Sequence, residues 1–250
     1  MFRGRIFSQV VFVCLIVLGL SITACSGPSR NIEAVLWIGG FAHDFEAGAA
    51  IIIDDILSKV TPSEVEIVRD GSFLDSPKAE KLDVIVMHHC FKSAEGVINK
   101  RQKQKLLDLI RGGVGVVAIH ASYYTFPEWH GVRELYGAKF IKHGAIDLMI
   151  NVRTVDKSHP IMEDLDESFV VKSELYESTP LAKDCHLLAM ASEKGKAIEH
   201  PSVWTRMYGK GRVVTILPAH WPESFRVESF QKLIANGVLW AAGRLDGNKK

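Results

Sequence analysis

Residues 113–120 read Gly-Val-Gly-Val-Val-Ala-Ile-His, an apolar run that ends on His120. Its length and its valine and isoleucine content are typical of a strand that is buried on both faces. Three further apolar runs also end on histidine: residues 35–43 on His43, residues 82–89 on His88 and His89, and residues 212–220 on His220. Helix-like segments separate most of these runs, which is the order of a parallel sheet wound with crossover helices.

The placement of these histidines predicts a functional site. The carboxyl ends of all strands in such a sheet lie along one edge, where open α/β sheets bind their ligands. Imidazole transfers protons near neutral pH and also ligates metals. We therefore expect a site at this edge, with His88 pointing away from it because side chains alternate along a strand.

The first 24 residues predict export. Arg3 and Arg5 precede an apolar stretch at residues 6–20, and small residues then lead to Cys25. This order is typical of a secretory signal, and the cysteine resembles the lipobox of bacterial lipoproteins. We expect residues 1–24 to be removed as a lipoprotein signal peptide and Cys25 to be acylated. A transmembrane anchor, or a cleaved signal with an incidental cysteine, is the alternative.

The same region of the sequence also predicts a linker and a cellular location. Residues 25–31 form a short flexible tether. Ser26 stands after Cys25 in place of an acidic residue, which by resemblance to lipoprotein sorting favours the outer membrane of the cell envelope, with the protein facing the periplasm.

The composition excludes other classes of protein. The formal net charge is +1, so the chain lacks the basic surplus of a nucleic-acid-binding protein. Beyond Cys25, the mature chain has only Cys90 and Cys185, too few for a small disulfide-dense domain. Residues 32–245 suit one α/β domain with an insertion.

The pattern predicts a mostly parallel sheet with an antiparallel extension. Parallel strands are expected at residues 33–38, 64–69, 82–87 and 114–119, with helices at residues 46–60, 100–111 and 129–136. Strand-like runs follow at residues 145–155, 168–176 and 186–192, then a hairpin of residues 203–208 and 212–217 and a last helix at residues 227–242. The basic run at residues 100–105 is expected to form a solvated helix face.

Seven fragments in order resemble the ThuA-like, or trehalose-utilisation, family. They are GFAHDF (40–45), GVVAIHAS (115–122), GAKFIKH (137–143), SHPI (158–161), SELY (173–176), HPSVWTRMYGKGRVV (200–214) and PAH (218–220). The resemblance covers residues 35–244. It implies a flavodoxin-like or class I glutamine amidotransferase-like three-layer sandwich, and a link with the metabolism of trehalose and related sugars, including 3-keto-glycosides.

The chain departs from the amidotransferases at one position. Those enzymes carry a nucleophilic cysteine at a tight turn between strand and helix, and the matching position here holds His120. Imidazole substitutes poorly for a thiolate in acyl transfer from glutamine, so we predict that the chain is not a glutamine amidotransferase. Cys90, beside His89, is a candidate for a displaced nucleophile, although a buried, inert cysteine is commoner.

The candidate catalytic residues are His120, His43 and Glu174. The resemblance brings Glu174 to the histidine edge as a general base or a ligand, and a solvent-facing carboxylate is the alternative. The candidate ligands of a divalent metal such as zinc are His43, His89, His120 and His220, because zinc takes three or four ligands of this kind. No nucleotide cofactor is expected.

The candidate substrate-binding residues are Trp204, Arg206, Tyr123, Tyr176 and His143. Trp204 and Arg206 alternate on one strand face and suit a sugar ring and its hydroxyls, but core packing beside a surface arginine also explains them. Tyr123 follows His120 and could wall the same crevice. The family resemblance favours His143.

The leading hypothesis is a lipid-anchored enzyme that acts on a sugar or 3-keto-glycoside by histidine and glutamate acid–base chemistry or with metal assistance. A lyase, isomerase or hydrolase reaction is expected. A non-catalytic sugar-binding lipoprotein and a metal-dependent hydrolase are the alternatives. The expected partners are a small carbohydrate and, through the anchor, the membrane, with no nucleic acid.

Overall fold

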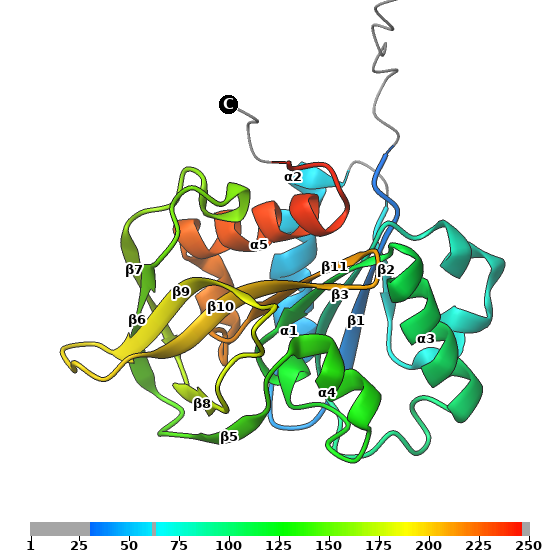
Figure 1. Cartoon of the computed structure of the whole chain (residues 1–250), viewed down its shortest axis with the longest axis horizontal. Helices are drawn as coiled ribbons and strands as arrows, with labels where there is room; N and C mark the ends of the chain where they lie inside the picture. Colours follow the sequence, from blue (N-terminus) through cyan, green and yellow to red (C-terminus); the bar gives the residue numbers. More distant parts are fainter. Residues whose placement is uncertain (1–30, 62–63, 247–250) are drawn as a thin grey trace, which may run out of the picture. The chain divides into compact units, whose positions relative to one another are not determined.

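Five parallel strands form one half of a nine-stranded sheet (Figure 1). In spatial order they are β2 (Glu66–Val68), β1 (Ala34–Gly40), β3 (Val84–Cys90), β4 (Gly115–Ile119) and β11 (Gly211–Ile216). This computed structural model describes residues 31–61 and 64–246. β4 is buried at every position, as expected for a central strand of entirely apolar residues.

Antiparallel strands extend the sheet beyond β11. In spatial order they are β10 (His200–Tyr208), β9 (His186–Glu193), β6 (Leu148–Thr154) and β7 (Ser168–Ser173). A separate two-stranded sheet pairs β5 (Phe140–His143) with β8 (Tyr176–Ser178). The prediction of a mostly parallel sheet with an antiparallel extension is confirmed.

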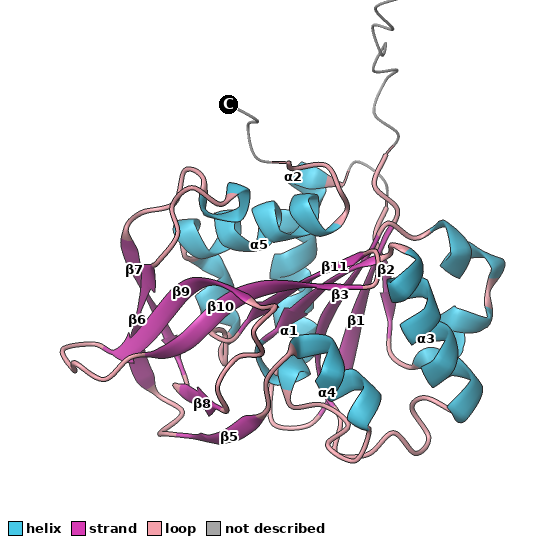
Figure 2. Cartoon of the chain, in the orientation of Figure 1, coloured by secondary structure: helices cyan, strands magenta, loops and turns pink. Residues whose placement is uncertain are grey.

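Helices cover both faces of the parallel strands, so that the domain has three layers (Figure 2). One face carries α1 (Phe45–Ile51) and α5 (Glu228–Ala241), and the other carries α3 (Lys100–Gly112) and α4 (His130–Tyr136). In β1, Leu36 and Ile38 belong to the first core, whereas Val35 and Trp37 belong to the second. This alternation explains why the parallel strands are apolar at nearly every position.

The remaining helices are short. α1 continues through a π-helical segment, Ile52–Leu57, into α2 (Ser58–Val60). Turns of 3₁₀ helix span Gly71–Asp75, Pro77–Lys81, His120–Tyr123, Pro160–Met162 and Pro222–Arg226.

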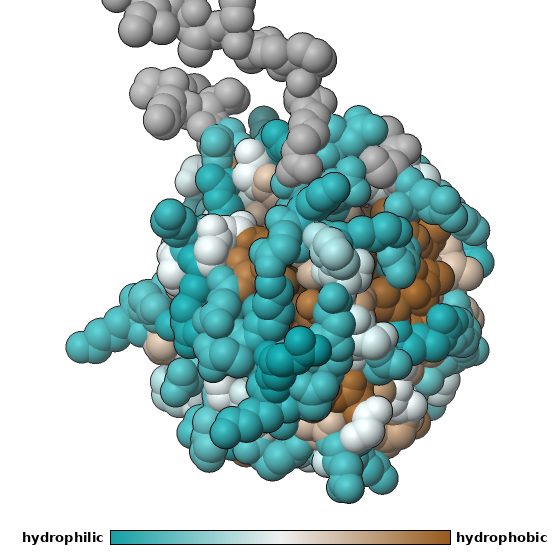
Figure 3. Space-filling view, turned by 90° about the vertical axis from the view of Figure 1, so that its right-hand side faces the viewer, coloured by the Kyte–Doolittle hydropathy of each residue, from teal (hydrophilic) through white to brown (hydrophobic). Residues whose placement is uncertain are grey.

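The surface of α3 agrees with the sequence prediction. Lys100 and Arg101 are exposed, whereas Leu106 and Ile110 are buried against the sheet. The face of the molecule that carries α3 is mainly hydrophilic, with separate hydrophobic patches (Figure 3). The basic run therefore forms a solvated helix face.

Residues 168–176 differ from the prediction of one continuous strand. The chain leaves the sheet after Ser173, and β8 begins only at Tyr176. The hydroxyl of Ser173 accepts hydrogen bonds from the backbone N–H groups of Ala219 and His220, at 3.0 and 3.2 Å. This link holds the end of β7 against the loop after β11, and Glu174 turns into the interior instead of continuing the strand. The short strand β5, which is largely exposed, was not predicted.

The predicted signal peptide and Cys25 lie outside the described residues. From Asn31 onward the chain forms one compact unit, which contains the expected domain of residues 32–245. Among the described residues, no helix has the length and apolar character needed to span a membrane.

Candidate metal and catalytic site

Four side chains converge beyond the carboxyl ends of the parallel strands. His43 follows β1, His120 follows β4, His220 follows β11, and Glu174 lies in the break between β7 and β8. One ligand atom from each of the four lies within 4.8 Å of the others. The imidazole of His43 lies 4.9 Å from that of His120 and 4.6 Å from that of His220, measured between ring centroids. We call these four residues the cluster.

Backbone carbonyls decide which ring nitrogen of two histidines faces the cluster. Nδ1 of His120 lies 2.6 Å from the carbonyl oxygen of Leu217, and Nδ1 of His43 lies 3.2 Å from that of Phe41. A carbonyl oxygen only accepts, so each Nδ1 carries the proton and donates it. The lone pair of each ring is therefore on Nε2. Metal-ligating histidines are usually held by this arrangement, in which the other ring N–H donates to a carbonyl or carboxylate.

Glu174 lies among the imidazoles. One carboxylate oxygen is 3.4 Å from Nε2 of His120, and the other is 3.3 Å from Nδ1 of His220. The second oxygen is also 3.4 Å from Nδ1 of His143, which is partly open to solvent. Glu174 itself is only 6% exposed, which excludes the alternative of a solvent-facing carboxylate.

Burial favours the neutral form of two imidazoles of the cluster. Burial and, after it, the neighbouring His120 together lower the pKa of His43 to about 4. Burial also lowers the pKa of His120, against the opposing effect of the neighbouring Glu174 carboxylate. For Glu174, burial would raise the pKa, but the neighbouring imidazoles of His120 and His220 outweigh this effect and hold the carboxyl below its usual pKa, in the ionised form.

This combination leaves lone pairs facing one another. Nε2 of His43 is buried without a hydrogen-bond partner, and so is Nδ1 of His220. The Glu174 carboxylate and the Nε2 lone pairs of His43 and His120 are all acceptors, so they cannot satisfy one another, and a buried negative charge without a counterion is costly. A divalent cation would accept all of these lone pairs at once. Three histidines and one carboxylate are ligands that suit zinc and other divalent transition metals.

The backbone around the cluster is held in an uncommon conformation. His120 has φ +51°, and the residues just before His43 and His220, Ala42 and Ala219, have φ +71° and +109°. Non-glycine residues rarely adopt positive φ, and such residues concentrate at functional sites. The hydroxyl of Ser173 binds the two N–H groups that follow one of these turns, and so fixes His220 relative to Glu174.

Two of the predicted substrate-binding residues lie beside the cluster. The hydroxyl of Tyr176 is 3.3 Å from Nε2 of His120, to which it can donate a hydrogen bond. Burial, and then the charge of Glu174, raise the pKa of Tyr176 well above its usual value, so the hydroxyl stays protonated. His143 reaches the same place from β5, and its ring lies 6.0 Å from that of Tyr176.

The structure does not bring Trp204, Arg206 or Tyr123 to the cluster. Trp204 is buried beneath α4 and donates from its ring nitrogen to the carbonyl oxygen of Tyr136 at 2.8 Å. Arg206 forms an ion pair with Asp184 at 2.7 Å. Tyr123 packs edge-on against Trp204, with 5.5 Å between ring centroids.

The paired histidines of β3 also stay outside the cluster. His89 lies among aromatic rings, 4.8 Å from Trp37 and 5.3 Å from Phe91 between centroids. His88 points to the opposite face, where its ring packs against Phe45 and Phe225. Both residues lie within β3, so their side chains point into the cores on opposite faces of the sheet. His120 and His220 instead follow the ends of their strands.

Cys90 is buried near the cluster, and its environment does not favour a nucleophile. Burial raises the pKa of its thiol to about 12, and the charge of Glu174 acts in the same direction. The thiol therefore stays protonated at neutral pH, and a protonated thiol is a weak nucleophile.

Two contributors were missed by sequence reasoning. Ser173 positions His220, although it was quoted only as part of the fragment SELY. Trp221 directly follows the histidine of PAH, and its ring lies 4.7 Å from that of His220. Ser173 directly precedes Glu174 and Trp221 directly follows His220. This proximity in the sequence was the only signal that could have identified them.

Comparison with known proteins agrees with this fold. Residues 33–241 match the family model described as ThuA, trehalose utilisation. None of the curated proteins compared with the chain matches it.

Solved structures are similar over most of the chain. A ThuA-like protein from Parabacteroides merdae has a TM-score of 0.71 at 19% identity, over 88% of this chain and 93% of that protein. One from Bacteroides uniformis has a TM-score of 0.69 at 20% identity, over 87% and 94%. A protein from Thermoplasma acidophilum, described as part of a GMP synthase, has a TM-score of 0.54 at 14% identity, over 86% and 96%. Such identities show the fold alone, and the predicted class I glutamine amidotransferase-like fold is confirmed.

We predict that Ser173→Ala weakens metal binding at the cluster by roughly tenfold or more, because residues that orient metal ligands typically contribute that much to affinity. Ser173→Thr keeps the hydroxyl and should bind nearly as well. Zinc affinity by competition with a chelator, together with the visible spectrum of the Co²⁺-loaded protein, measures the effect. Ser229→Ala is the matched control, since Ser229 is also buried but donates to Asp166, which is not part of the cluster. Equal affinities for the two alanine variants would show that Ser173 does not position the cluster.

A second prediction concerns His89 and stability in acid. Burial lowers the pKa of His89 from 6.5 to about 3, so between these pH values the unfolded chain binds a proton that the folded chain does not. The free energy of unfolding therefore falls as the pH falls through this window, by about 1.4 kcal/mol per pH unit for one such group. His89→Phe should flatten the dependence by about that amount between pH 4 and 6, as measured by urea unfolding. An unchanged slope would contradict the prediction.

Proposed function

This chain belongs to the ThuA family, described as trehalose utilisation, and from that membership we propose that the cluster binds a divalent metal ion and acts on a sugar or glycoside. The observation that carries the proposal is the convergence of three imidazoles and one buried carboxylate within 4.8 Å. A 3-keto-glycoside is the substrate that fits best, because a ketone gives the site an oxygen to bind and an acidic neighbouring C–H bond.

The cluster residues would hold the ion, and His43 and His120 are already oriented for this by the carbonyls of Phe41 and Leu217. When bound, the ion would polarise the ketone oxygen and make the neighbouring C–H bond more acidic. Glu174 keeps the negative charge that balances the ion. Burial of the cluster excludes water on the protein side and strengthens these electrostatic interactions.

Tyr176 and His143 are the residues that would contact the substrate. The hydroxyl of Tyr176 stays protonated and so donates a hydrogen bond to a sugar oxygen. His143 is the most exposed imidazole beside the cluster, with 41% of its side chain exposed. It can therefore take a proton from the substrate and release it to solvent. Proton removal beside the ketone leads to elimination or isomerisation.

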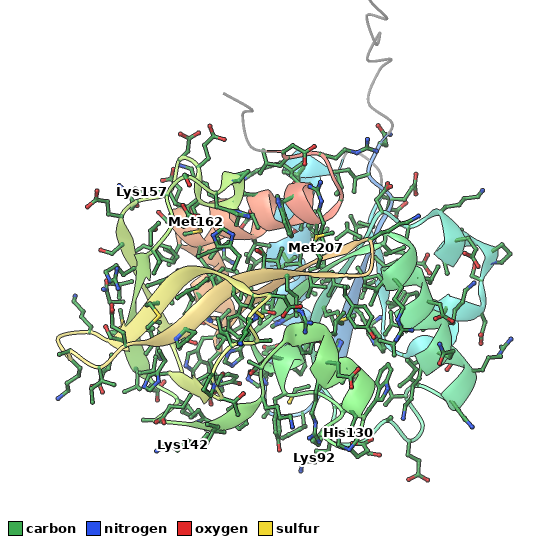
Figure 4. The ribbon with its side chains drawn as sticks, viewed as in Figure 1. Lys92, His130, Lys142, Lys157, Met162 and Met207 are labelled. Atoms are coloured by element: carbon green, nitrogen blue, oxygen red, sulfur yellow. The ribbon has the colours of Figure 1, made fainter. Side chains whose placement is uncertain are left out.

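We predict that His120→Ala lowers turnover by about a hundredfold or more, because it removes one of the ligands that would hold the ion. Turnover is followed by NMR on a panel of 3-keto-glycosides, with bound metal measured by elemental analysis of the same preparation. His130→Ala is the control: His130 is exposed on α4 and points outward at the lower edge of Figure 4. It should change neither quantity.

The outcomes separate the alternatives. A fully active preparation without metal would remove the metal from the proposal and leave acid–base chemistry by the histidines. Sugar binding without turnover across the panel would overturn the enzymatic proposal in favour of a sugar-binding protein.

We also propose that the protein is exported and held at the membrane by acylation of Cys25, facing the periplasm. The support is the order of basic, apolar and small residues before Cys25. Mass spectrometry of the chain expressed in a bacterium should detect acyl groups at Cys25, and Cys25→Ala should release the protein in soluble form. A mature chain without acyl groups would contradict this anchor.

A further inference from the structure

A cavity of about 170 Å³ opens beside β5. It is lined by residues Tyr123, Tyr124, Thr125, Pro127, Arg133, Ala138, Lys139 and Phe140. Three of these side chains are aromatic and two are cationic. We call this cavity the Arg133 pocket.

A row of aromatic rings joins the Arg133 pocket to the cluster. Phe140 lines the pocket, and its ring centroid lies 5.0 Å from that of Tyr176. The hydroxyl of Tyr176 is in turn 3.3 Å from Nε2 of His120. On the other side, Tyr124 lies 4.8 Å from Phe140 between ring centroids and is 39% exposed. The pocket is therefore separated from the cluster by little more than one layer of rings.

The two cations of the pocket have no acidic partner. Neither Arg133 nor Lys139 forms an ion pair with any residue in the part of the chain that the structure describes. Two acidic residues in this region pair with other cations: Glu177 with Lys142 at 3.2 Å, and Asp184 with Arg206 at 2.7 Å.

The interior of the pocket offers one further polar group. Tyr123 is 4% exposed, and its hydroxyl has the hydroxyl of Ser178 as a neighbour but forms no hydrogen bond of good geometry. Buried hydroxyls are nearly always hydrogen-bonded in proteins. A bound polar ligand, or a small shift toward a neighbouring hydroxyl, would satisfy it.

We propose that the Arg133 pocket is a second subsite, which binds an acidic group, a carboxylate or a phosphate, on the part of the glycoside adjacent to the ring at the cluster. Arginine and lysine side chains recognise both anions, and arginine does so through paired hydrogen bonds. The aromatic walls suit the apolar face of a sugar ring. The cavity is smaller than the 300–1,000 Å³ typical of whole-ligand pockets, so it suits one ring or one substituent.

This inference rests on the proposed sugar function, and the experiment separates the two. Methyl β-glucuronide, glucose 6-phosphate and the neutral methyl β-glucoside are titrated calorimetrically into the metal-loaded protein. The acidic probes should bind about tenfold or more tightly than the neutral one, since hydrogen bonds to charged groups contribute that much. The tighter of the two acidic probes identifies the anion.

The double variant Arg133→Gln/Lys139→Gln should remove this preference and leave the affinity for methyl β-glucoside unchanged. The control is Arg226→Gln/Lys210→Gln, which removes the same charges far from the pocket and should keep the preference. Equal affinity of the wild type for acidic and neutral probes would overturn the subsite. So would a preference that survives in the double variant.

The proposed function fails by a different result. If His120→Ala and removal of the metal leave the affinity for all three probes unchanged, the cluster does not bind sugars. An acidic preference that depends on Arg133 would then still support the pocket as an anion site.

Discussion

The parallel pairing of β1, β3, β4 and β11 is the constraint on which the rest of the site depends. Parallel strands end at the same edge, so the loops after β1, β4 and β11 meet there although their residues are far apart in the chain. The register pairs Ile216 of β11 with Ile119 of β4, which brings the turns that follow them close together. Only Glu174 reaches the cluster from outside this parallel set, and the hydroxyl of Ser173 holds it in place.

The chemistry of the cluster follows from where its protons are. Two of the imidazoles donate their Nδ1 protons to backbone carbonyls. Their Nε2 atoms therefore face the centre of the cluster with unshared lone pairs. Glu174 adds a negative charge that is almost fully buried. A structural core would pair such a carboxylate with a cationic side chain, and no lysine or arginine in the part of the chain that the structure describes is paired with it. The cluster is therefore organised to receive a cation rather than to supply one.

Much of the fold could be predicted from the sequence, because buried parallel strands leave long apolar runs and the helices between them leave a clear period. The site could be predicted in part. His43, His120 and His220 follow strand ends, where strand order alone brings them together, whereas His89 lies within β3 and is directed into a core. Glu174 was reached only through a family resemblance, since it lies in a break that interrupts the expected strand. The carbonyls of Phe41 and Leu217 orient two of the rings. They could not be predicted from the sequence, because every residue has a backbone carbonyl.

The wide spacing of the cluster residues along the chain has a consequence for assembly. The cluster residues run from residue 43 to residue 220, and no two of them are close enough in sequence to hold an ion in an unfolded chain. The ion would thus be acquired only after the last parallel strand has docked, in whichever compartment folding is completed. Metal uptake would then report on the native topology itself, because the cluster is complete only when the chain up to His220 has folded.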